Sequence, residues 1–92
     1  MLEREMGCTL EELSRWLPGA VGPAAPTPIA GGWRIAVPGG EVVLEAEPRP
    51  PRRIALLDLP VLHVRLRFLG LGPEARGDFL ARFDAWTRRG GG

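Results

Sequence analysis

Apolar and polar residues alternate along two short segments of the sequence that flank a pair of glycines. Residues 33–37 and 42–46 both have the two-residue period of a half-buried strand. Gly39-Gly40 between them suits a two-residue hairpin turn, because glycine readily adopts the positive φ that such a turn needs. This turn predicts a register whose apolar pairs are Val37 with Val42, Ile35 with Leu44 and Trp33 with Ala46. On the other face it sets Arg34 opposite Glu45, an attractive cross-strand pair.

A second pair of strands is predicted after a proline-rich stretch. Residues 47–52 contain three prolines and are predicted to form a stiff extended connector. The two strands are then expected at residues 53–57 and 61–68, joined by a turn at Asp58-Leu59-Pro60. The last strand directs Leu62, Val64, Leu66 and Phe68 toward the core and His63, Arg65 and Arg67 away from it. With this turn, Arg53 lies opposite Arg65.

Two segments have the period of amphipathic helices. Thr9 and Glu12 form the pattern of a capping box, and apolar residues at helical spacing follow, so a helix is predicted over residues 10–17. Pro18-Gly19 is expected to end it. A second helix is predicted over residues 74–87, after Pro73.

These elements predict an α+β fold in which residues 1–92 form a single domain. The expected architecture is a two-layer sandwich, in which a four-stranded antiparallel meander carries the N-terminal and the C-terminal helix on one face. Residues 1–8 are interpreted as an N-terminal arm and residues 88–92 as a flexible tail. Residues 18–32 are interpreted as a loop rich in Pro, Ala and Gly, which either drapes over the core or hides a short edge strand near residues 27–30.

Composition narrows the function classes. The formal net charge of +1 gives no strong field toward nucleic acid or an anionic membrane. The chain contains no Lys, Asn or Tyr, which indicates a GC-rich genome. The charged N-terminal segment lacks the apolar run of a signal peptide, and no stretch approaches the about 20 apolar residues that span a bilayer. We therefore expect a cytoplasmic protein of bacterial origin that does not bind membranes and is not expected to bind nucleic acid.

Residues able to perform catalysis are few. The chain has one His (His63), one Cys (Cys8) and one Ser (Ser14), and no two of them have the spacing of a nucleophile and its base. Cys8 precedes a predicted helix, where the helix dipole lowers a thiol pKa, but an ordinary surface or half-buried thiol is the favoured interpretation. A metal site would have to consist mainly of carboxylates, and the glycine pairs match no phosphate-binding motif. The sequence therefore predicts no enzyme, no metal and no cofactor.

The outer face of the predicted sheet is the candidate binding surface. It is expected to combine basic residues with apolar ones, and its candidate binding residues are Arg34, Arg53, Leu57, Val61, His63, Arg65 and Arg67. Guanidinium groups beside small apolar side chains suit the recognition of proteins or anions. The favoured function is a small non-catalytic binding or accessory domain that contacts a protein partner or a second copy of itself. The alternative is a binder of anions or single-stranded nucleic acid that uses the same arginines.

Overall fold

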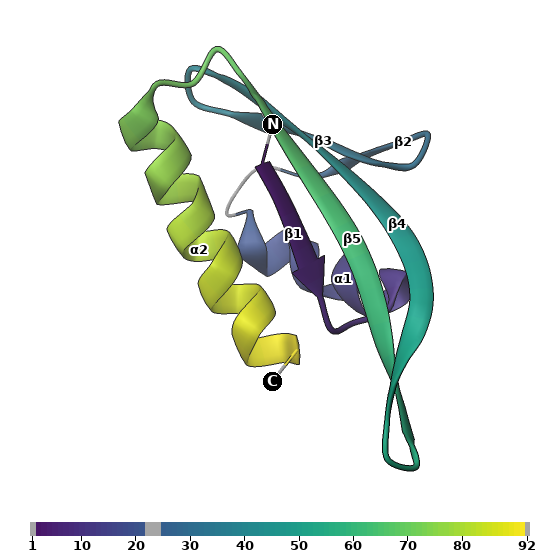
Figure 1. Cartoon of the computed structure of the whole chain (residues 1–92). Helices are drawn as coiled ribbons and strands as arrows, with labels where there is room; N and C mark the ends of the chain where they lie inside the picture. The colour runs from purple at the N-terminus through teal and green to yellow at the C-terminus, as the bar shows by residue number, and fades with distance from the viewer. Residues whose placement is uncertain (1, 22–24, 92) are drawn as a thin grey trace.

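An antiparallel sheet of five strands forms one layer of the molecule, and two helices form the other (Figure 1). The computed structural model describes residues 2–21 and 25–91. The elements in chain order are β1 (Leu2–Met6), α1 (Leu10–Ala20), β2 (Thr27–Ile29), β3 (Gly32–Val37), β4 (Gly40–Ile54), β5 (Leu57–Leu69) and α2 (Pro73–Gly91). The strands lie in the order β1-β5-β4-β3-β2. The predicted α+β class is confirmed, with five strands in place of four.

The core lies between the inner face of the sheet and both helices. Alternate residues of β5 and β4 are buried, and they pack in one cluster with residues of both helices. The cluster includes Leu62, Val64 and Leu66 of β5, Val42 and Leu44 of β4, Leu13 and Leu17 of α1, and Phe79 and Phe83 of α2. Because residues of both helices belong to this cluster, the helices cover the same face. The opposite face of the sheet is left to solvent, as is common in antiparallel sheets.

The β3–β4 hairpin keeps the predicted faces but not the predicted register. Ile35 is buried and Arg34 is exposed, as expected. The turn is Pro38-Gly39 rather than Gly39-Gly40, so Ile35 pairs with Val42 and Val37 pairs with Gly40. The predicted register is wrong by two residues. Gly40 is the first residue of β4 and packs closely against β5. Only glycine fits there, since a Cβ atom would lie only 2.0 Å from the carbonyl oxygen of Leu69.

The proline-rich stretch is part of a long strand and not a connector. β4 continues from Gly40 to Ile54, and β5 pairs with it along most of its length. A bulge between Arg49 and Arg52 accommodates the prolines, which lack a backbone donor. The strands turn at residues 55–56, where Ala55 has a φ of 55°, and not at the predicted residues 58–60. Asp58 is instead in β5, opposite Arg53.

Both edges of the sheet come from segments that were interpreted as irregular. The predicted arm of residues 1–8 is wrong, because Leu2–Met6 form β1, which pairs with β5. The segment 18–32 contains the short edge strand β2, the second of its two predicted alternatives. Pro28 is tolerated there because an edge strand needs fewer donors. The remainder of that segment includes residues 22–24, which lie outside the described residues.

Each helix extends beyond its predicted end. The predicted capping box is confirmed, since the Thr9 side chain accepts from the Glu12 amide and the Glu12 carboxylate accepts from the Thr9 amide. Pro18-Gly19 does not end α1, which continues to Ala20. Its last turn is held by α2, because Arg82 Nε donates to the Gly19 carbonyl at 2.9 Å.

The C-terminal helix includes most of the segment that was interpreted as a tail. Helix α2 runs to Gly91, so residues 88–91 are helical rather than a separate flexible tail. Glycine only lowers helix propensity, by about 1 kcal/mol relative to alanine, and does not forbid helical φ and ψ. The last residue of the predicted tail, Gly92, lies outside the described residues.

Candidate functional site

Four of the predicted site residues lie together on the outer face of the sheet. His63, Arg65 and Arg67 are alternate residues of β5, and Arg34 is on β3, two strands away. Arg53 and Leu57 do not join them, because both are near the β4–β5 turn. Val61 lies between the two groups, opposite Arg49. The predicted Arg53–Arg65 pair is therefore wrong, and Arg65 lies opposite Glu45 of β4 and Glu3 of β1.

Carboxylates on the neighbouring strands flank these cations. Glu3 and Glu5 of β1 lie on one side of the β5 row, and Glu45 and Glu47 of β4 lie on the other. The ion pairs are Arg65 with Glu47 at 3.4 Å, Arg67 with Glu45 at 3.9 Å, Arg34 with Glu41 at 3.6 Å, Arg49 with Glu47 at 3.8 Å, and Arg52 with Glu5. Each exposed pair adds little stability, about 0–1 kcal/mol. Together they balance the charge of the face.

The acidic half of this face was not predicted from the sequence. Glu3 and Glu5 were assigned to an irregular arm, although Leu2-Glu3-Arg4-Glu5-Met6 alternates with a period of two. That alternation was the available signal. In the structure Leu2, Arg4 and Met6 are half-buried, whereas Glu3 and Glu5 are exposed. Arg4 reaches α2, where it forms an ion pair with Asp84 at 2.9 Å.

His63 has two polar partners that the sequence did not predict. Its Nε2 lies 2.9 Å from a carboxylate oxygen of Glu3, and its Nδ1 lies 2.9 Å from a guanidinium nitrogen of Arg49. These three residues line a shallow polar hollow of about 240 Å³. A carboxylate can orient an imidazole for acid–base chemistry, whereas nucleophilic catalysis also needs a nucleophilic side chain within reach. Cys8 is buried in the core, and Ser14 is on α1, the helix layer on the other side of the sheet.

The Cys8 thiol is protected by its surroundings. It is only 2% exposed and belongs to the core cluster. Burial raises its pKa from 9.0 to about 11, and the Glu12 carboxylate adds to the shift. A thiol with such a pKa is almost entirely protonated at neutral pH and is a poor nucleophile. The helix dipole considered from the sequence is therefore outweighed by desolvation.

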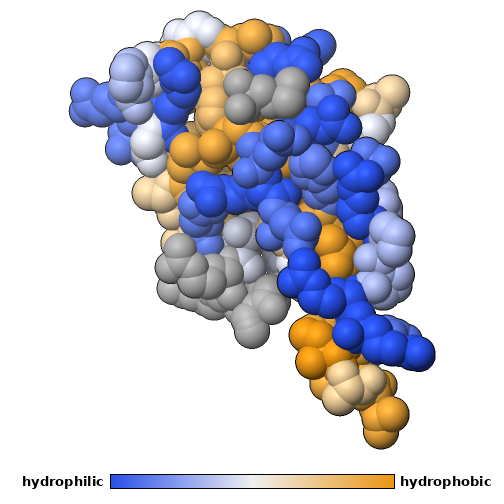
Figure 2. Space-filling model, in the orientation of Figure 1, coloured by the Kyte–Doolittle hydropathy of each residue, from blue (hydrophilic) through white to orange (hydrophobic). Residues whose placement is uncertain are grey.

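The β4–β5 hairpin projects beyond the rest of the sheet. We call residues 47–61 the ribbon, because β3 and β1 no longer pair with β4 and β5 there. Its tip exposes Ile54, Leu56, Leu57 and Leu59, whose exposed fractions are 52%, 99%, 63% and 40%. Figure 2 shows this apolar tip at the bottom of the view, below a band of hydrophilic residues. We call these four residues the apolar tip.

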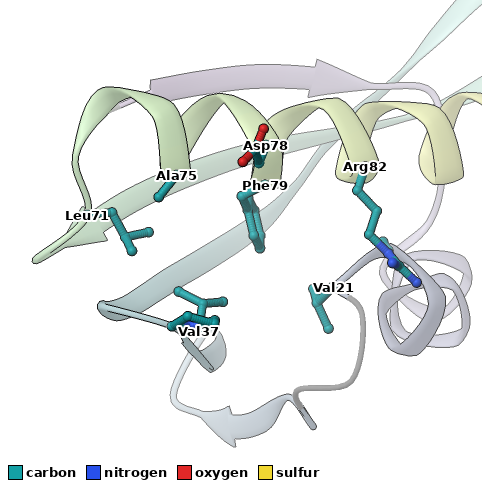
Figure 3. Close-up of a pocket in the computed structure, with 9 residues that line it drawn as sticks. Val21, Val37, Leu71, Ala75, Asp78, Phe79 and Arg82 are labelled. Atoms are coloured by element: carbon teal, nitrogen blue, oxygen red, sulfur yellow. The ribbon is translucent and has the colours of Figure 1, made fainter.

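A groove opens at the other end of the sheet. It has a volume of about 270 Å³ and lies between the end of α1, the β3–β4 turn and the first half of α2. Val21, Val37, Leu71 and Phe79 give it apolar walls (Figure 3). Asp78 and Arg82 of α2 also line it. This volume is below the about 300–1,000 Å³ that is typical of small-molecule pockets, and it suits one or two aliphatic side chains.

The described part of the chain offers no metal site. Within residues 2–21 and 25–91, His, Cys, Asp and Glu form no group of three or more that could hold a metal ion. In the same ranges, no helix has the length and apolar character needed to cross a membrane. No protein-family model, curated protein or solved structure matches the chain.

Proposed function

We propose that the protein is a small non-catalytic binding domain that contacts another protein through the apolar tip of the ribbon. The observation that carries this proposal is the exposure of the tip, above all of Leu56, which is 99% exposed. Hairpin turns are ordinarily built from Gly, Asn, Asp and Pro, whereas this one is Ala55-Leu56, with Ala55 at a φ of 55°. Exposed clusters of large aliphatic residues are typical of interaction surfaces.

The contact we propose is made by side chains and not by strand addition. An open two-stranded ribbon has unpaired backbone groups along both edges, to which another strand can bind. Here Pro48, Pro50 and Pro51 reduce the number of backbone donors in β4, and Pro60 reduces it in β5. Proline on an edge discourages strand pairing. The tip beyond these prolines retains its apolar side chains for a partner.

The outer face of the sheet is a weaker candidate for the binding surface than the apolar tip. Its arginines already have carboxylate partners in Glu41, Glu45 and Glu47. An anion or a nucleic-acid phosphate would have to displace these carboxylates, and the balanced face would not attract it from a distance. The contact is therefore proposed at the tip, and the arginines of the outer face are assigned to cross-strand pairing.

Site-specific photocrosslinking tests the proposal. A photoreactive phenylalanine analogue replaces Leu56 in the full chain, which is irradiated in the cells that naturally make it. The matched control carries the analogue at Arg15, an exposed residue of α1 that belongs neither to the ribbon nor to the groove lining. We expect discrete protein adducts from position 56 that are missing from position 15. An added Leu57→Asp change should reduce their yield about tenfold or more, because burying a charge at an apolar contact is costly.

A second control separates the tip from the outer face. An Arg67→Ser change removes an exposed ion pair with Glu45 and should leave the position-56 adducts unchanged. Circular dichroism and thermal melting establish that each variant is folded. Identical adduct patterns from positions 56 and 15, or adducts lost on Arg67→Ser but kept on Leu57→Asp, would contradict the proposal.

A further inference from the structure

The chain carries an apolar projection and an apolar groove that it cannot bring together. The apolar tip lies at the end of β4 that carries Ile54, and the groove lies beside the turn that precedes Gly40 at the other end of β4. Fifteen residues at about 3.3 Å each make this strand as long as the molecule, whose greatest extent is 46 Å. Figure 1 shows the β4–β5 turn and the β3–β4 turn at opposite ends of the β4–β5 ladder, so the tip and the groove lie far apart. One chain cannot fill its own groove with its own tip.

The charged residues beside the tip and the groove are complementary. Behind the tip, Arg53 Nε lies 3.1 Å from an Asp58 carboxylate oxygen across the ribbon. At the groove, α2 presents Asp78 and Arg82 one helical turn apart. Asp78 has no ion-pair partner among the described residues. A tip that enters the groove can set Arg53 against Asp78 and Asp58 against Arg82, which is the electrostatic matching that selects partners and orientations.

We propose that the groove receives the apolar tip of a second copy of this chain, so that the protein forms a two-fold dimer with two tip-in-groove contacts. The proposal rests on the proposed function and names the partner of that same tip. The groove volume of about 270 Å³ fits aliphatic side chains such as Leu56 and Leu57. Its apolar walls, among them Val37 and Phe79, offer these side chains the burial that they lack in one chain.

Two-fold symmetry follows from the placement of the two features. When two copies lie antiparallel, the tip of each is beside the groove of the other, and the two contacts satisfy both chains at once. A single tip-in-groove contact repeated head to tail would leave a free tip and a free groove at the ends of a growing chain. The reciprocal arrangement closes, and it doubles the apolar surface that is buried.

Sedimentation velocity of the purified full chain, from micromolar to millimolar concentration, tests the dimer. We expect the wild type to reach the mass of two chains. Leu56→Asp should weaken dimerisation about tenfold or more, because it places a carboxylate in the apolar groove. Ala75→Phe, which fills the groove from α2, should weaken it similarly. Asp78→Arg should also weaken it, whereas Glu74→Arg, the same reversal on the same helix but outside the groove lining, should not.

Crosslink mapping identifies which surfaces meet. With the photoreactive residue at position 56 of the purified protein, we expect adducts to residues 71–82 or to the β3–β4 turn of the partner. A wild type that stays monomeric throughout overturns the proposal. So do dimers whose adducts map to residues 54–59, which would show tip-to-tip pairing. A monomer that sediments with vesicles of phosphatidylcholine and phosphatidylglycerol, and loses this binding on Leu56→Asp, also overturns the dimer. That result would show that the apolar tip binds a membrane.

The two proposals fail differently. A wild-type monomer whose position 56 crosslinks to a different protein in cells overturns the dimer and supports the proposed function. Position 56 giving no more adducts than position 15 in cells overturns the proposed function itself.

Discussion

At the scale of single residues, Cys8 determines how the protein responds to alkali. Its pKa is raised to about 11 in the folded chain from 9.0, so the unfolded chain loses its thiol proton first as the pH rises. The contribution to stability is complete below pH 9 and is lost as the pH rises toward 11. We expect the free energy of unfolding to fall by up to about 2 to 3 kcal/mol across this window, since one pKa unit corresponds to about 1.4 kcal/mol.

The sequence makes this measurement unusually direct. The chain has no Lys and no Tyr, the side chains that ordinarily titrate near pH 10. Denaturant unfolding of wild type and Cys8→Ala at several pH values isolates the thiol. The Cys8→Ala curve should be flat between pH 9 and pH 11, where the wild-type curve falls. Equal slopes in the two proteins would assign the alkaline loss to another group.

Gly40 and Gly77 should respond in opposite ways to the same substitution. In Gly40→Ala the added methyl group would lie 2.0 Å from the Leu69 carbonyl oxygen, a backbone atom that moves only if β5 moves. We expect a loss of about 2 kcal/mol or more in the free energy of unfolding. Gly77 is exposed within α2 with no atom near its Cβ position, so Gly77→Ala should stabilise the protein by up to about 1 kcal/mol. Urea titration of both variants measures the difference, and a neutral Gly40→Ala would contradict the crowding.

At the scale of elements, the helices and the β3 strand follow from their sequence patterns, whereas the turns do not. Gly39-Gly40 is an acceptable hairpin turn by its own chemistry, but Gly40 lies in β4 close to the Leu69 backbone of β5, and the turn is Pro38-Gly39. The prolines of residues 48–51 similarly suggest a break in the strand. However, the rule against proline in strands applies to strands that have a neighbour on each side. In the ribbon β4 has one neighbour, a fact that belongs to the sheet and not to the local sequence.

The ribbon should be dispensable for folding. None of the core residues that the structure describes lies between residues 50 and 60. We expect replacement of residues 50–60 by Asn-Gly, which joins the paired residues Arg49 and Val61 by a two-residue turn, to leave a cooperatively folded body. The free energy of unfolding should change by no more than about 1 kcal/mol, because the removed residues contribute none of the described core and the Arg52–Glu5 ion pair that joins them to β1 is exposed. Thermal unfolding without a cooperative transition would show that the ribbon supports the core.

At the scale of the whole molecule, the layers and the faces were predictable, but the neighbours on each face were not. A register error of two residues returns every side chain to its original face, so Ile35 and Leu44 stay in the core although their predicted partners are wrong. The charge of the outer face depends on those neighbours, because Arg65 lies opposite Glu3 and Glu45 and not opposite Arg53. The apolar tip was not predicted, because a turn at residues 58–60 would have paired Leu56 with Leu62 and buried it.

The pairing of β1 with β5 also sets the order in which the chain folds during synthesis. Leu2 pairs with Leu66, so β1 leaves the ribosome well before β5, the strand with which it pairs. The buried face of α1 waits longer still, because Phe83 of α2 completes its packing. The β3–β4–β5 meander needs only neighbours in sequence and is free to form first. Each nascent chain therefore exposes the apolar side of α1 until α2 has been synthesised, and a chaperone near the exit tunnel can bind this side in the meantime.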